Sequence, residues 1–193
     1  ILSQHSDIFL PTDKEAHFFD MDDRYEKGMD WYFDEFFQEY KNEKVCGVCN
    51  PEYLFFENVA ERLYKAHGKD LKLIFIFRNP SERAFSHYLM TKRRLREAYS
   101  FEEAIEHENS RLDLNYQHKT DYSYVSRGLY AKQVKQFLKF FPVKNMLFIR
   151  FEDDFIKERK KTITEVFEFL NIQREIVNEN IKSNAAKNAN SKF

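Results

Sequence analysis

Cysteine is scarce in this sequence, and long apolar runs are absent. Two cysteines, Cys46 and Cys49, occur in 193 residues. A disulfide framework of the kind found in small secreted proteins would need more, so a reducing compartment fits better. The longest uninterrupted apolar run, at 73–77, is far shorter than the roughly 18 residues that span a bilayer. We therefore predict a chain without a transmembrane helix.

The net charge is also small, with a formal value of -1 at pH 7. The 32 acidic residues nearly balance the 31 basic ones, which leaves no global field of the kind that attracts nucleic acids or membrane surfaces. We therefore expect no nucleic-acid partner, and any anion site must be local. The densest basic run, at 91–96, is expected to form a solvated helix face.

Apolar and aromatic residues, by contrast, are plentiful. Hydrophobic residues make up 42% of the chain and aromatic residues 17%, with 21 Phe and 11 Tyr, so extended disorder is excluded over most of the length. A chain of this size suits one domain with a substantial core. Because no internal repeat or low-complexity linker divides it, we predict a single domain over residues 1–193.

The two cysteines are separated by two residues. This spacing is compatible with a redox pair or with half of a metal site, but the sequence holds no second pair of the kind. The strand-like setting at 44–49 favours ordinary buried thiols instead. No metal is predicted.

Strand-like and helix-like segments alternate along the chain. Residues 71–77 have the pattern of a strand buried on both faces, whereas 111–125 have no clear period and predict a long loop. The other expected strands are 44–49 and 145–152, and the expected helices are 27–41, 51–67, 80–97, a segment from residue 100, 126–142 and 153–172. This order predicts an α/β fold with three layers, in which helices flank a mostly parallel sheet.

Polar residues follow the strand at 71–77, where a buried strand has no need of them. Arg78 comes directly after the strand, Asn79 has the position of a helix cap, and Ser86 lies two turns into the next helix. Ligands of open α/β sheets bind at the carboxyl ends of strands. A guanidinium, a hydroxyl and free backbone N–H groups at a helix start would form a local anion site. Taken one at a time, these residues fit a surface cation and a helix-surface hydroxyl equally well.

The segment RNPSERAFSHY, residues 78–88, resembles the 3'-phosphate-binding segment of sulfotransferases that use 3'-phosphoadenosine 5'-phosphosulfate (PAPS). DKEAHFFD at 13–20 is similar to a segment of the glycan-modifying branch, which includes the heparan sulfate 3-O-sulfotransferases and bacterial relatives. The segments at 126–142 and 150–154 resemble later parts of the same family. The resemblance covers most of residues 1–155 and implies a P-loop-like sulfotransferase fold.

The resemblance also implies an activity and its residues. PAPS would be the donor and 3'-phosphoadenosine 5'-phosphate (PAP) the product, with no metal, and the acceptor would be a hydroxyl or amine of a small molecule or oligosaccharide, most readily a carbohydrate. Arg78 and Ser86 would hold the 3'-phosphate, and Tyr130 would line the nucleotide site. Glu15 matches the catalytic base, His17 a neighbour that assists at the acceptor, and Asp20 an acidic position that orients the site. From the residues alone, Glu15 beside Lys14 and His17 is either an acid/base cluster or a surface charge.

The sequence departs from the family pattern in two places. The chain starts with ILSQHSDIFLP, which resembles the end of the helix that follows the family's phosphosulfate loop. We therefore expect that loop and its Lys upstream of Ile1, and a chain shortened at both ends. In VCNPEYL, at 48–54, Cys49 and Asn50 replace a family Lys and a hydroxyl residue, so acceptor preference is expected to differ.

Two other functions stay open from the sequence. A non-catalytic nucleotide-binding or interaction protein would keep the fold and the 3'-phosphate site. A P-loop kinase is less well supported, because no GxxxxGK[ST] motif is present. A soluble bacterial cytoplasmic location is favoured, and a lumenal Golgi location stays open.

Overall fold

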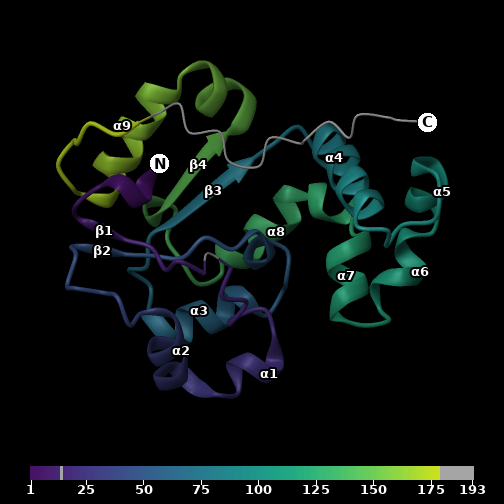
Figure 1. Ribbon diagram of the computed structural model, residues 1–193, viewed down its shortest axis with the longest axis horizontal. Helices are drawn as coiled ribbons and strands as arrows, with labels where there is room; N and C mark the ends of the chain where they lie inside the picture. Colours follow the sequence, from purple (N-terminus) through teal and green to yellow (C-terminus); the bar gives the residue numbers. More distant parts are fainter. Residues whose placement is uncertain (14, 179–193) are drawn as a thin grey trace.

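Two pairs of parallel strands form the β-structure of the protein. The computed structural model describes residues 1–13 and 15–178 (Figure 1). β1 (Ile8–Phe9) pairs with β2 (Val45–Cys46), and β3 (Leu73–Phe77) pairs with β4 (Met146–Arg150), both in parallel. Parallel partners need a crossover connection, and helices supply it in each case. The α/β class and the parallel pairing are confirmed, although the described strands lie in two two-stranded sheets.

Helices pack on β3 and β4 from two sides (Figure 1). On one side the main core joins Phe75 of β3 to α8 (Tyr130–Phe137), with the Phe75 and Phe137 rings 5.2 Å apart, and to α3 (Val59–His67). On the other side α9 (Arg159–Leu170) contacts β4 and packs on Ile8 of β1. The expectation that β3 is buried on both faces is wrong, because alternate strand residues face opposite sides and Ile76 is 53% exposed.

The remaining helical elements connect these layers. They are η1 (Leu2–Gln4), α1 (Asp22–Tyr25), α2 (Gly28–Phe36), η2 (Pro51–Leu54), α4 (Pro80–Arg93), α5 (Phe101–Glu106), α6 (Glu108–Leu112), α7 (Tyr116–Tyr122), η3 (Ser126–Gly128), η4 (Val143–Asn145) and the π-helical η5 (Phe151–Lys157). The predicted helix at 80–97 ends early, since Leu95 takes a left-handed φ of 57°. Within the described residues, none of these helices is both long and apolar enough to cross a membrane.

The segment 111–125 is not the long loop that its sequence predicts. α6 and α7 pass through it and form, with α4 and α5, the lobe at the right of Figure 1. The Asn115 side chain accepts a hydrogen bond from the backbone N–H of His118 at 2.9 Å and so caps α7. Asp121, only 6% exposed, is bound by Arg96. These helices are short and held by polar contacts, which leave no apolar period in the sequence.

The two cysteines are exposed rather than buried, so the expectation of buried thiols is wrong. β2 contains only two residues, Val45 and Cys46, and β1 is its sole partner in the described part of the chain. A strand at the edge of so small a sheet leaves one side open to solvent. The strand-like pattern therefore identified the element correctly but not its burial.

Candidate active site

The segment between β1 and α1 carries the three acid/base residues that the sequence indicates. Phe18 and Phe19 anchor it, since both side chains are buried in the main core at 0% and 1% exposure. His17, just before them, has a φ of 47°. A non-glycine residue in the left-handed region is uncommon and marks a tight local turn. This turn directs the His17 ring back toward Asp20.

The structure brings Glu15, His17 and Asp20 into one chain of contacts. Nδ1 of His17 lies 2.9 Å from Oδ2 of Asp20, and Nε2 of the same ring lies 3.6 Å from Oε2 of Glu15. The Asp20 side chain is fully buried, whereas that of Glu15 is 55% exposed. Because an ionised carboxylate can only accept hydrogen bonds, Nδ1 of His17 carries the hydrogen and donates this bond to Asp20. A buried acid thus fixes an imidazole whose other nitrogen faces an accessible carboxylate.

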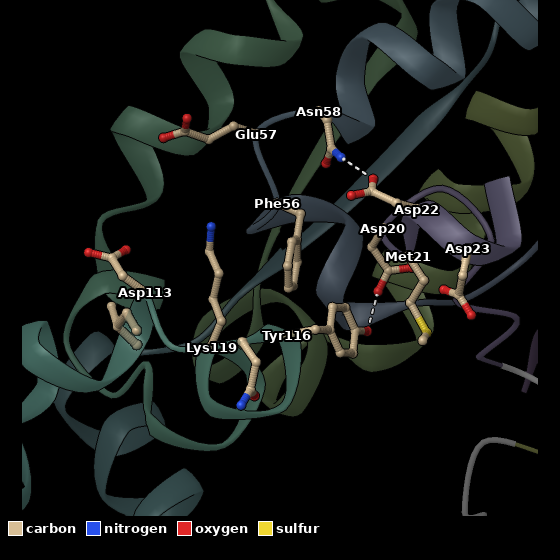
Figure 2. Close-up of a pocket in the computed structure, with 12 residues that line it drawn as sticks. Asp20, Met21, Asp22, Asp23, Phe56, Glu57, Asn58, Asp113, Tyr116 and Lys119 are labelled. Atoms are coloured by element: carbon tan, nitrogen blue, oxygen red, sulfur yellow. Dashed lines mark hydrogen bonds between the residues drawn. The ribbon is translucent and has the colours of Figure 1, made fainter. Parts of the chain in front are cut away.

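Tyr116 and Asn50 complete this group, and sequence reasoning did not assign either to it. The Tyr116 hydroxyl donates to Oδ2 of Asp20 at 2.7 Å (Figure 2). It also lies 3.0 Å from Nδ1 of His17. Nδ2 of Asn50 lies 3.3 Å from the same nitrogen. Asn50 stands at a position where the sequence departs from the pattern of the family that it resembles, and this departure was the one available signal. Tyr116 belongs to α7, within the segment expected to be a loop, and nothing local links it to Asp20.

The surroundings of this group raise the pKa values of His17, Tyr116 and nearby Tyr53. The hydrogen bond to Asp20 raises the pKa of His17, against the opposing effect of burial. Burial, followed by the hydrogen bond to Asp20, raises the pKa of Tyr116, and burial raises the pKa of nearby Tyr53 to about 12. At neutral pH both phenols therefore stay protonated, and Tyr116 remains a donor to Asp20.

Asp20→Asn should lower the pKa of His17 and move it toward or below its ordinary value. The reason is that the largest contribution to the raised pKa is the Asp20 hydrogen bond. In the wild type, a raised folded-state pKa adds stability that is fully present below the unfolded value of 6.5 and is lost as pH rises through the folded value. An NMR titration of the His17 ring measures the shift directly. An unchanged His17 pKa in Asp20→Asn would contradict the assigned contact.

The predicted anion residues lie at the carboxyl end of β3. Phe77, the last residue of β3, pairs with Arg150 of β4, so Arg78 emerges at the shared edge of the two strands. Its guanidinium is 37% exposed, with Nη2 3.5 Å from Glu82 and Nε 3.8 Å from Glu152. Both contacts are longer than a good charge-assisted hydrogen bond. Nε is buried and has no hydrogen-bond partner among the described residues. It is therefore available as a donor to an anion.

The backbone at the start of α4 does not contribute as predicted. The expectation of free N–H groups at this helix end is wrong, because the Asn79 side chain accepts from the N–H groups of Ser81 and Glu82 at 3.0 and 3.2 Å. The N–H of Asn79 itself donates to the Glu152 carboxylate. The Asn79 side chain that caps α4 therefore occupies the backbone N–H groups that an anion would need. An anion here is therefore left with side chains, mainly Arg78 and Ser86.

Ser86 and Tyr130, the other two predicted nucleotide contacts, both follow Arg78 in the chain and have different roles. Ser86 is exposed on α4, and its hydroxyl makes no hydrogen bond to a side chain or backbone group of the described residues. The Tyr130 hydroxyl donates to the Arg78 carbonyl at 2.9 Å, and its ring lies 4.8 Å from that of Phe77. Tyr130 thus holds the end of β3 in place. Its hydroxyl is already engaged, so its contribution to a bound nucleotide would come from the ring.

Glu52 and Arg127 connect the acid/base group to the anion residues. The Arg127 guanidinium forms an ion pair with Glu52, two residues after Asn50. Arg127 lies in η3, whose Gly128 approaches Pro80 so closely that an added Cβ would stand 3.0 Å from the proline Cβ. A side chain at Gly128 would therefore push against the start of α4. This close packing couples the position of Arg78 to that of the segment around His17.

The part of the chain that the structure describes holds no group of three or more His, Cys, Asp or Glu residues arranged to bind a metal ion. The side chains present do fit an anionic nucleotide. Arg78 supplies a partly exposed guanidinium with a buried, unpartnered Nε, and phosphate is a preferred partner of arginine.

Known proteins resemble this chain over nearly its whole length. The model of the sulfotransferase domain family matches residues 1–192. Heparan sulfate glucosamine 3-O-sulfotransferase 5 of Mus musculus is 31% identical over 182 residues, which cover 92% of this chain and 50% of that protein. Heparan sulfate glucosamine 3-O-sulfotransferase 3B1 of Homo sapiens is 30% identical over 186 residues, which cover 96% of this chain and 45% of that protein. The chain thus spans about half the length of these curated relatives.

A solved structure shares the fold. The crystal structure of a sulfotransferase from Alicyclobacillus acidocaldarius matches with a TM-score of 0.81 and 32% sequence identity. The match covers 94% of this chain and 78% of the other.

Proposed function

We propose that this chain, which belongs to the sulfotransferase family, moves a sulfuryl group from PAPS to a hydroxyl or amine of an acceptor. The observation that carries the proposal is the contact chain in which buried Asp20 fixes His17 and His17 faces the accessible carboxylate of Glu15. An exposed base beside an oriented imidazole is what deprotonation of an acceptor requires. Arg78 supplies the matching anion contact at the end of β3.

Glu15 is the general base of the proposed reaction. It removes the acceptor proton as the acceptor oxygen or nitrogen forms a bond to sulfur, and the bond from sulfur to the bridging phosphate oxygen breaks, its electron pair leaving with PAP. His17 positions the acceptor through Nε2, the ring atom that lies 3.6 Å from Glu15. Asp20 and Tyr116 keep the ring in this orientation, since both contact Nδ1. Holding reacting groups in place in this way removes much of the entropic barrier.

Arg78 and Ser86 hold the 3'-phosphate of the nucleotide in this proposal. PAPS, when bound, supplies an activated sulfuryl group on a phosphate leaving group. The Tyr130 hydroxyl donates to the backbone carbonyl of Arg78 and so fixes the backbone there, while the guanidinium makes loose contacts to Glu82 and Glu152. A phosphate would outcompete these two contacts, because bidentate charge-assisted hydrogen bonds to phosphate are shorter and stronger.

A carbohydrate is the acceptor class that we propose. The relatives with curated names act, by those names, on the glucosamine of heparan sulfate. In this chain the aromatic rings of Phe56 and Tyr116 stack 5.0 Å apart beside the acid/base group. Aromatic rings with a few fixed polar groups are typical of ligand sites.

A calorimetric comparison of PAP with 5'-AMP on the intact protein tests the nucleotide part of the proposal. The two ligands differ only in the 3'-phosphate. PAP should bind at least about tenfold more tightly, since hydrogen bonds to a charged group are worth about 1.5–3 kcal/mol. Equal affinities for PAP and 5'-AMP would contradict the assignment of Arg78 and Ser86 to that phosphate.

A further inference from the structure

An open cleft of about 670 Å³ lies against the acid/base group (Figure 2). Asp20 and Tyr116, the two residues that hold His17, belong to its wall. The rest of the wall comes from α1, from the connection between η2 and α3, and from the ends of α6 and α7. A molecule in this cleft would therefore touch the partners of His17, which makes the cleft a candidate for the acceptor.

The wall of the cleft is strongly acidic. It contains five carboxylates and a single ammonium group, that of Lys119; the carboxylates are Asp20, Asp22, Asp23, Glu57 and Asp113. Arg62 pairs with Asp22, and Lys132 lies 3.6 Å from Glu57. Asp23 and Asp113 have no ion pair to any described residue, and both are exposed. Figure 2 shows these two acids on opposite sides of the cleft.

Asp20 gives an independent indication that this cleft receives a donor. The residue is 3% exposed, and its Oδ2 accepts from His17 and Tyr116. Oδ1 of the same carboxylate is buried and has no hydrogen-bond partner among the described residues. Leaving a buried polar group without a hydrogen-bond partner costs about 1–3 kcal/mol, and leaving a buried charged group without one costs more. Because Asp20 belongs to the wall, a ligand that reaches Oδ1 from the cleft would supply the missing donor.

The aromatic part of the wall is also suited to a cation. The rings of Phe56 and Tyr116 stack with an interplanar angle of 24°. Nζ of Lys119 lies 5.1 Å from the centroid of the Phe56 ring, within the range of a cation–π contact. The part of this aromatic pair that borders the cleft would contact the apolar side of a sugar ring.

We infer that the acceptor is an oligosaccharide with free amino groups, whose ammonium charges face Asp20, Asp23 and Asp113 in this cleft. The inference rests on the proposed sulfuryl transfer and specifies its acceptor. A sulfated glycan, the substrate class in the names of the relatives, is a polyanion, and like charges across an interface oppose binding. The acceptor hydroxyl or amine to be sulfated would lie toward His17 and Glu15, while the other amino groups neutralise the acidic wall.

Binding of three tetrasaccharides to the intact protein tests the inference without relying on turnover. The probes are glucosamine tetramer, its fully N-acetylated neutral form and an N-sulfated heparan tetrasaccharide, titrated calorimetrically at low salt. The cationic probe should bind at least about tenfold more tightly than the neutral one, with the affinity falling as salt rises. The anionic probe should bind most weakly. Equal or tighter binding of the neutral or anionic probe, or no binding of any probe, would overturn the inference.

A charge-neutral double variant, Asp23→Asn with Asp113→Asn, locates the effect in the cleft. Both side chains are exposed and lie outside the contacts of His17, so folding should be preserved. The affinity for the cationic probe should fall about two- to thirtyfold, as expected for the loss of two exposed ion pairs, and the affinity for the neutral probe should not change. Asp70→Asn, an exposed acid away from the cleft, is the matched control. An unchanged cationic affinity in the double variant would contradict the assigned site.

Titration of PAP into the same samples separates this inference from the proposed function. If PAP binds and the sulfuryl group moves to a neutral or anionic glycan, the proposed function stands and the cationic acceptor is wrong. If PAP does not bind, the proposed function fails, and the binding of the cationic probe still decides whether the cleft is selective for positive charge.

Discussion

Glu15→Gln is expected to reduce the rate of sulfuryl transfer by about 10²- to 10⁴-fold, the range typical of the loss of a general acid or base. Glutamine keeps the shape of the side chain but cannot accept the acceptor proton. The side chain is 55% exposed, so the substitution should leave folding intact. Measured initial rates with saturating PAPS give the size of the effect, and calorimetry with PAP should show an unchanged affinity.

Asp13→Asn is the matched control for this variant. Asp13 is an exposed acid in the same segment, and its loss removes one negative charge without removing the base. The rate should stay within about twofold of the wild type, as for most surface substitutions. Full activity of Glu15→Gln, or an equal loss in Asp13→Asn, would show that Glu15 is not the base.

Arg78→Ala is expected to weaken PAP binding about 10- to 150-fold, the equivalent of losing about 1.5–3 kcal/mol of charged hydrogen bonds. The Arg78 guanidinium makes long contacts of 3.5 and 3.8 Å to two carboxylates and lies 6.0 Å from the Phe151 ring, so its removal should disturb little else in the fold. Calorimetric titration of PAP into the intact protein measures the change. Affinity for 5'-AMP, which lacks the 3'-phosphate, should change much less.

Arg150→Ala provides the comparison. Arg150 ends the neighbouring strand at the same sheet edge, but its guanidinium is bound to Asp153 and Asp154. PAP affinity should therefore be nearly unchanged, and Arg78→Lys should fall between wild type and Arg78→Ala, since lysine keeps the charge without the planar fork. A loss in Arg150→Ala as large as that in Arg78→Ala would indicate a general electrostatic effect.

Local chemistry made the segment from β3 to α4 predictable. The apolar run at 73–77 forms β3, and Asn79 and Pro80 begin α4 as a cap and a first helical residue. Each of these features depends on residues close in sequence. Glu15, His17 and Asp20 lie within six positions of one another. One short segment that resembles the family was therefore enough to indicate all three, and they meet as a group in the structure.

Contacts between segments that are distant in the chain could not be predicted from the sequence. Tyr116 meets Asp20 across 96 positions, and no local pattern in 111–125 indicated even the helix that carries it. The donors at the start of α4 were expected to be free, but Glu152, 73 positions away, binds the first of them. Exposure of Cys46 depends on the small size of the β1–β2 sheet, and Cys49 lies beyond the end of β2. In each case the environment of the residue is set by a segment far away in the chain or, within the described residues, by the absence of one, and local sequence patterns do not report either.

A single-turnover experiment tests the central claim most directly. The intact protein, in excess over sulfur-labelled PAPS, is mixed with the glycan acceptor, and labelled product and PAP are counted together. The account predicts that the two appear in equal amounts and at the same rate, and that Glu15→Gln slows both while still binding PAP. Tight binding of PAP with no label in any hydroxyl- or amine-bearing acceptor would contradict it, and would identify a nucleotide-binding protein without transferase activity.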